Sequence, residues 1–268
     1  MQVECVEIPE FVKIFTKLLL HGGAAVKKTD NKLMKRSIVS MKPYLTLALV
    51  AGSLQGVAAA DVTGKVSLKG TPKPEIAIDL GPQCGKFSKP ASTRHYVVGK
   101  DGGLANVFVY VKDAKAAPVT GDGPLLDQVG CMYTPYVLAV GVNQKFKVKN
   151  SDPEMHNVHS TPKSPANKEF NFAQMAGSAV QERSFSAAEV AVRMKCDVHP
   201  WMFAYVGVFD HPHFAVTDVD GNFKISGLPD GDYTLVAYHL KSHGANDGVV
   251  EKISVKGSAK KDITVTLP

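Results

Sequence analysis

The sequence predicts an all-β protein, and three observations lead to that fold class. Nearly every periodic segment after residue 60 alternates apolar with polar residues or is rich in β-branched and aromatic residues, which is typical of strands. These segments are short, and Gly, Pro, Asn and Asp stand between them, where such residues favour turns. The length of 268 residues allows one or two domains with a sizeable core. We therefore expect a β-sandwich or barrel.

The expected elements can be placed along the chain. The clearest strand patterns occupy residues 62–68, 106–112, 144–150, 204–209 and 232–238. Residues 191–195 are also strand-like. The tail predicts a hairpin with a turn at Asp220-Gly221, a second turn at residues 228–231 and another strand. The one helix candidate after residue 60 spans Ser186 to Val190.

The net charge of +6 is concentrated at the N-terminus. Residues 1–60 contain eight of the 31 Lys and Arg residues but four of the 25 Asp and Glu residues. The rest of the chain is close to balanced, and it contains no basic run interleaved with aromatic residues. We therefore expect no nucleic-acid binding.

The N-terminal segment has the pattern of a secretory signal peptide. Lys35-Arg36 and Lys42 precede an apolar run from Tyr44 to Val57, and Ala58-Ala59-Ala60 is typical of a cleavage site. The run is too short for a comfortable membrane span, although an uncleaved anchor is the alternative. We expect residues 1–60 to comprise an upstream segment and a signal peptide cleaved after Ala60. The mature protein would be periplasmic or secreted, with no membrane span.

A short motif, Cys196-x-x-His199-x-x-Met202, offers a thiolate, an imidazole and a thioether within one loop. A second imidazole can come from His156 or His159, which follow a strand-like run. Two His, one Cys and a weak axial Met form the ligand set of a type 1 copper site. Any one of these residues alone would more often be structural, but their joint spacing predicts one bound copper ion.

Around these residues the chain resembles the cupredoxins, and amicyanin and plastocyanin most closely, over roughly residues 130 to 210. Residues 136–150 resemble the strands before the first ligand, and 155–159 match the amicyanin form of the segment that carries it. The resemblance implies a Greek-key β-sandwich or barrel and selects His156 as the ligand. It also implies that the peptide N–H of Asn157 donates to the thiolate sulfur. Pro200 lacks an N–H, which limits hydrogen bonding near that sulfur.

The residues beside the motif suggest how a partner could approach. Pro200, Trp201 and Phe203 could form an apolar docking patch around the exposed edge of His199, suited to brief contacts with redox proteins. The alternative is that Trp201 closes the mouth of the barrel and contacts no partner. Nothing in the sequence indicates an oligomeric state.

Two further cysteines, Cys84 and Cys131, remain after the leader and the motif are set aside. An oxidising compartment favours their pairing, and closing that loop could stabilise the fold by about 4 kcal/mol on the chain-entropy model. Two free buried thiols are the alternative.

The tail, residues 215–235, resembles the carboxypeptidase regulatory-like domain, and residues 62–66 resemble the first strand of that domain. The resemblance implies a second β-sandwich, either split by the copper module or fused with it. We expect its first part at residues 61–125, the cupredoxin module at 126–212 and its second part at 213–268.

The leading functional hypothesis is an exported carrier of single electrons that is not an enzyme. No paired carboxylates or second His cluster suggest a substrate site, and Met202 closes the axial position. The alternatives are a copper storage or delivery protein, and a partner-binding β-sandwich with a structural copper site.

Overall fold

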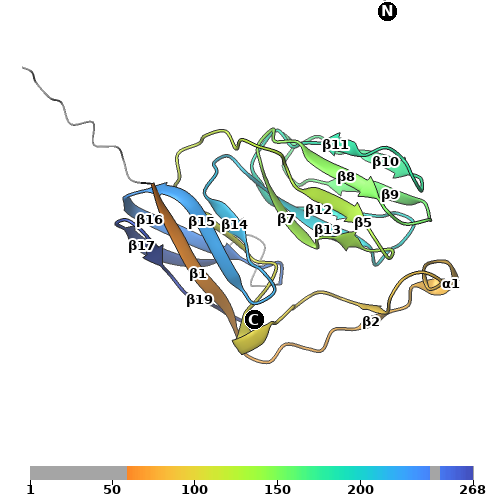
Figure 1. Ribbon diagram of the computed structural model, residues 1–268, viewed down its shortest axis with the longest axis horizontal. Coiled ribbons are helices and arrows are strands. Elements are labelled where there is room, and N and C mark those ends of the chain that lie inside the picture. Colours follow the sequence, from red (N-terminus) through yellow and green to blue (C-terminus); the bar gives the residue numbers. More distant parts are fainter. Residues whose placement is uncertain (1–58, 242–247, 268) are drawn as a thin grey trace, which may run out of the picture. The chain divides into compact units, whose positions relative to one another are not determined.

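The computed structural model describes residues 59–241 and 248–267, which belong to one compact unit. These residues form four main β-sheets and a small two-stranded one (Figure 1). The predicted all-β fold class is therefore confirmed. Residues 1–58, which contain nearly all of the predicted leader, lie outside the described residues.

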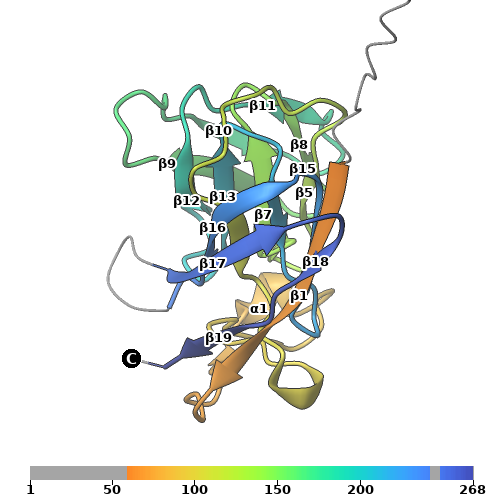
Figure 2. The same cartoon turned by 90° about the vertical axis from the view of Figure 1, so that its left-hand side faces the viewer.

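Two of the sheets combine strands from both ends of the described chain. The first has β15 beside β1, with β18 and β19 on the other side of β1 (Figure 2). The second has the order β14-β4-β16-β17. The strands are β1 (Ala59–Lys69), β4 (Phe108–Val111), β14 (Phe214–Val216), β15 (Asn222–Pro229), β16 (Gly231–Tyr238), β17 (Val249–Val255), β18 (Ala259–Lys260) and β19 (Ile263–Thr266). Val62 and Ile225 from the first sheet share one buried core with Val109 and Leu235 from the second. The regulatory-like identity of this sandwich and the predicted domain boundaries stay predictions.

The other two sheets use the middle of the chain, in the orders β10-β9-β12-β13-β7 and β11-β8-β5-β6. The strands are β5 (Leu125–Gln128), β6 (Tyr133–Thr134), β7 (Val137–Gly141), β8 (Phe146–Asn150), β9 (His156–Thr161), β10 (Asn171–Gln174), β11 (Gln181–Arg183), β12 (Glu189–Lys195) and β13 (Phe203–Phe209). Burial alternates along β8 and β9, so one face of each strand enters the core. That core joins Phe146 and Leu126 with Met194, Cys196 and Met202.

The predicted helix at Ser186–Val190 is wrong, because this segment bends and then enters β12. The carboxylate of Glu189 accepts hydrogen bonds from the backbone N–H groups of Lys163 and Ser164, at 2.7 and 3.1 Å. These long-range contacts, together with the pairing of Glu189 with Val208, favour the extended backbone. The α-helix among the described residues is instead the four-residue α1 (Gly81–Cys84), with proline in its first turn.

A linking segment, residues 71–98, joins β1 to the rest of the chain. It contains β2 (Ala77–Ile78), α1 and β3 (Ala91–Ser92). The expected disulfide between Cys84 and Cys131 is present and attaches this segment to the turn between β5 and β6. The linking segment therefore lies next to the loop that carries the metal motif, where Trp201 packs against the disulfide cluster.

Candidate metal centre

The loop Cys196–Met202 connects the paired strands β12 and β13, and backbone hydrogen bonds close it. The N–H of Cys196 donates to the carbonyl of Met202 at 3.0 Å, and the N–H of Met202 donates to the carbonyl of His199 at 2.9 Å. The second bond makes residues 199–202 a β-turn with Pro200 at its second position, where proline is favoured. Pro200 is exposed in this turn. The loop geometry thus places three candidate donors from seven residues at one end of the sheet.

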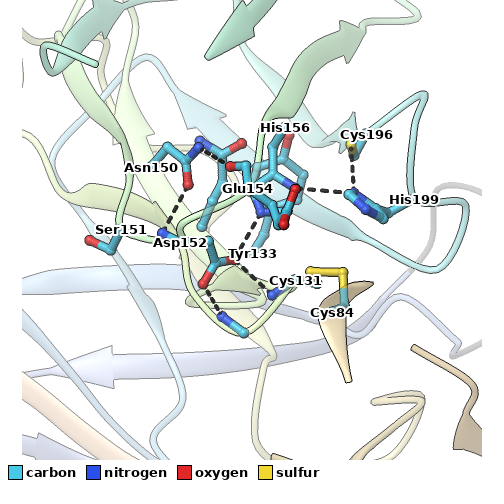
Figure 3. A network of polar contacts seen from close by, with 12 residues as sticks. Cys84, Cys131, Tyr133, Asn150, Ser151, Asp152, Glu154, His156, Cys196 and His199 are labelled. Carbon is cyan, nitrogen blue, oxygen red and sulfur yellow. Dashed lines mark hydrogen bonds and ion pairs between the residues drawn. A yellow bond between two sulfur atoms is a disulfide. The ribbon is translucent and has the colours of Figure 1, made fainter. Parts of the chain in front are cut away.

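Three donor atoms converge beneath this loop (Figure 3). The Nδ1 atoms of His156 and His199 are 3.1 Å apart, and Nδ1 of His199 lies 3.6 Å from Sγ of Cys196. The side chains are buried, with relative exposures of 0% for His156, 3% for Cys196 and 7% for His199. Met202 is fully buried in the same core cluster as Cys196. The structure therefore brings together two imidazoles and a thiol whose ring nitrogens and sulfur face one point.

Backbone N–H groups stabilise the sulfur of Cys196 as a thiolate. The N–H of Asn157 donates to Sγ at 3.4 Å, as the sequence resemblance implied. Burial acts to raise the pKa of the Cys196 thiol, but the hydrogen bond with His156 and the surrounding N–H groups outweigh burial and lower it. A thiolate is the form that binds a metal ion.

Asn157 also fixes the position of the loop relative to β9. Its side-chain oxygen accepts the N–H of Asp197 at 2.9 Å. Its carbonyl accepts the hydroxyl of Tyr133, a buried side chain, at 2.7 Å. The peptide N–H that faces the sulfur is therefore held in a rigid frame.

The carboxylate of Asp152 orients His156, and sequence reasoning missed this residue. Oδ2 of Asp152 lies 2.8 Å from Nε2 of His156, so the Nε2–H donates to the carboxylate and Nδ1 faces the other donors. The same carboxylate accepts the N–H groups of Gly130 and Cys131, at 2.6 and 2.8 Å (Figure 3). The four-residue separation of Asp152 and His156 was a weak signal of this contact, because the two residues flank the start of a strand.

The two imidazoles differ in charge in the metal-free chain. Burial opposes protonation of His156, but the hydrogen bonds with Asp152 and Cys196 outweigh it and raise the pKa of His156 to about 9. Burial and the nearby charge of His156 lower the pKa of His199. His199 is thus neutral at pH 7 and can donate a lone pair, whereas His156 must first release a proton.

His159, the competing ligand candidate, faces away from the cluster. Alternation along β9 places His159 on the opposite face from His156. Both of its ring nitrogens lie against carboxylates, Nδ1 at 2.8 Å from Asp197 and Nε2 at 2.7 Å from Glu169. These contacts leave neither nitrogen available to a metal ion at the buried cluster.

Trp201 and Phe203, the predicted docking residues, are partly buried. The indole N–H of Trp201 donates to the carbonyl of Cys131 at 3.1 Å, and its ring centre lies 5.3 Å from that of His199. Both aromatic side chains line a small cavity of about 160 Å³ with Ile78 and Arg94 of the linking segment. These contacts favour the alternative in which Trp201 closes the site, and a docking role stays a prediction.

The donor set fits copper. Two imidazoles and a thiolate suit both Cu(I) and Cu(II), and the thioether of Met202 in the same loop would supply a fourth, soft donor. His156, Cys196, His199 and Met202 would hold the ion, which would supply one-electron redox chemistry. The buried, hydrogen-bonded frame limits rearrangement between the two oxidation states.

No protein-family model matches the chain, and the comparison with curated proteins found no match. Several solved structures align with about a third of it. A copper-containing nitrite reductase from Thermus scotoductus SA-01 is 16% identical over 37% of this chain and 25% of its own, with a TM-score of 0.30. A purple cupredoxin from Nitrosopumilus maritimus is 22% identical over 32% of this chain and 99% of its own, with a TM-score of 0.27.

A variant of amicyanin in its reduced Cu(I) form is 20% identical over 37% of this chain and 97% of its own, with a TM-score of 0.28. This chain thus spans a quarter of the nitrite reductase and nearly all of the two small copper proteins. Because all three TM-scores are 0.30 or lower, the assignment of the site rests on its donor geometry.

Replacing His156 by Ala should abolish the visible absorption of the copper-loaded chain at about 600 nm, because the buried site loses one of its two nitrogen donors. His159→Ala is the matched control on the other face of β9 and should retain the band. Absorption spectroscopy of both variants checks this. The reverse result would show that His159 is the ligand.

Copper affinity should rise with pH up to about 9, because His156 carries a proton below that pH and the metal must displace it. The apparent dissociation constant should fall by roughly tenfold per pH unit, as expected for one released proton. Chelator competition with Cu(I) between pH 6 and 9 measures this constant.

Asp152→Asn should flatten the pH profile of copper affinity by lowering the pKa of His156. Glu169→Gln is the control, because it removes a carboxylate from His159, and it should leave the pH profile unchanged. Equal profiles in the unmodified protein and both variants would contradict the role of Asp152.

Proposed function

We propose that the chain is an exported, cupredoxin-like protein that binds one copper ion and carries single electrons between redox proteins. The observation that carries the proposal is the convergence of Nδ1 of His156, Nδ1 of His199 and Sγ of Cys196 within a buried site. Soft and borderline donors in this combination are those of type 1 copper sites.

The surroundings of the donors favour electron transfer over catalysis. The three donors are nearly inaccessible to solvent, and Met202 is completely buried in the same loop. A substrate would need an open coordination position, which catalytic metal sites keep, and a bond from Met202 to the ion would fill that position here. An electron can leave through the protein without such an opening.

Two features support export to the periplasm or the outside of the cell. The leader pattern at residues 35–60 is that of a signal peptide. The disulfide between Cys84 and Cys131 is of the kind that persists in oxidising compartments. None of the helices formed by residues 59–241 and 248–267 has the length and apolar character needed to span a membrane.

Redox partners would make brief contacts at the tip of the metal loop. Val198 is 49% exposed there, and Pro200 is exposed beside it. These apolar residues cover the buried donors with one turn of chain, so a partner at the tip would approach the copper site closely. We propose this tip, formed by Val198 and Pro200, as the docking surface, with Trp201 closing the site beside it.

Copper loading of the purified mature chain tests the proposal. We expect one copper per chain, a strong band at about 600 nm from thiolate-to-copper charge transfer, and repeated oxidation and reduction without metal loss. Cys196→Ser is the control that removes the thiolate and should remove the band. Tight binding of Cu(I) that gives no such band after oxidation, with ready transfer of the ion to a chelator, would instead indicate copper storage or delivery.

A further inference from the structure

A second group of buried soft donors lies beside the first one. The Sγ atoms of Cys84 and Cys131 and a ring nitrogen of His199 are all within 4.8 Å of one another. The relative exposures are 1% for Cys84, 0% for Cys131 and 7% for His199. The two sulfurs are joined as a disulfide in this structure, and His199 belongs to both groups of donors.

Hydrogen bonds hold Cys131 in place in addition to the disulfide. Gly130 and Cys131 have φ values of 65° and 54°, and they form the tight turn between β5 and β6. The Asp152 carboxylate accepts both of their backbone N–H groups, and the carbonyl of Cys131 accepts the indole N–H of Trp201. These hydrogen bonds would hold Cys131 beside His199 after reduction.

The linking segment that carries Cys84 has anchors of its own. The guanidinium of Arg94 donates to the carbonyl of Tyr133 at 2.9 Å, and it stacks on the ring of Tyr136 at 4.4 Å from the centroid. Leu80 and Ile78 pack in the same apolar cluster as both cysteines. Reduction would thus separate the sulfurs without releasing the segment.

Two thiolates and one imidazole form a donor set that suits the soft ion Cu(I). Metal–donor bonds of about 2.0–2.3 Å place donor atoms on one ion up to about 4.5 Å apart. The ring nitrogen of His199 lies within 4.8 Å of both sulfurs, and the two sulfurs, which are bonded to each other in this structure, would have to move apart on reduction for both to bind the ion. An exported chain also passes through a state with free thiols, because disulfide formation takes seconds to hours.

We propose that the chain, before its disulfide forms, binds Cu(I) through Cys84, Cys131 and His199. An external disulfide then accepts two electrons from the pair of thiolates and two protons from solvent, forming two thiol molecules, while the Cys84–Cys131 bond closes and Cu(I) is released from the two sulfurs. The closed disulfide no longer offers thiolates, and His199 remains for the site with His156 and Cys196. The sulfur pair would thus serve as a site for taking up copper during maturation.

Cu(I) titration of the full mature chain carrying Cys196→Ser tests this proposal independently of electron transfer, because that variant already lacks the thiolate of the first site. The protein is prepared with the disulfide intact or reduced with a dithiol, and the thiol number is verified by mass. Anaerobic chelator competition should show one Cu(I) bound by the reduced form, with an affinity higher on the order of 100-fold than that of the oxidised form. X-ray absorption should show two sulfur neighbours and one nitrogen neighbour.

Two additional substitutions in the same background identify the donors. Cys84→Ser should remove one sulfur neighbour, and His199→Ala should remove the nitrogen; each should weaken binding to the reduced chain. The Cys84→Ser/Cys131→Ser chain with Cys196 intact shows by its copper absorption that the fold persists without the disulfide. Equal Cu(I) affinity of the reduced and oxidised Cys196→Ser chains would overturn the proposal, as would binding that is unaffected by Cys84→Ser.

Discussion

The carboxylate of Asp152 is the contact on which the arrangement of the site depends. It accepts two backbone N–H groups from the turn at Gly130 and Cys131, and it accepts Nε2–H of His156. One buried acidic group therefore fixes both the turn that carries a disulfide sulfur and the imidazole that turns Nδ1 toward Cys196. Losing this carboxylate would leave several buried N–H groups without a hydrogen-bond acceptor, which is costly because these groups cannot regain hydrogen bonds to water.

His199 links the two groups of donors that this frame holds. Its Nδ1 lies near the thiolate of Cys196, and a ring nitrogen also lies within 4.8 Å of the disulfide sulfurs. The ring of Trp201 packs against this imidazole and the disulfide lies beside it, so His199, the most exposed of the three donor residues, is still largely enclosed. The covalent bond that attaches the linking segment is therefore part of the environment of the metal site, and it stabilises the fold as well.

The features that could be predicted from the sequence are those that depend on local spacing. Strand periodicity identified β1, β4, β8, β13 and β16, and the loop Cys196–Met202 brings its donors together because only a few residues separate them. Two contacts between distant segments were also expected: the number of cysteines favoured the disulfide between Cys84 and Cys131, and the resemblance selected His156. Other long-range contacts could not be predicted. Tertiary packing brings Cys84 and Cys131 close to His199. It also allows the carboxylate of Glu189 to accept hydrogen bonds from the N–H groups of Lys163 and Ser164. These hydrogen bonds favour a strand where the sequence predicted a helix, at Ser186–Val190.

The most direct test of the copper site is a crystal structure of the copper-loaded mature chain. It should show copper bonded to Sγ of Cys196 and to the Nδ1 atoms of His156 and His199, with the sulfur of Met202 as a longer axial contact. The Asp152 carboxylate should still accept Nε2–H of His156. Copper bound through Nε2 of His156, or bound without Cys196, would contradict the account.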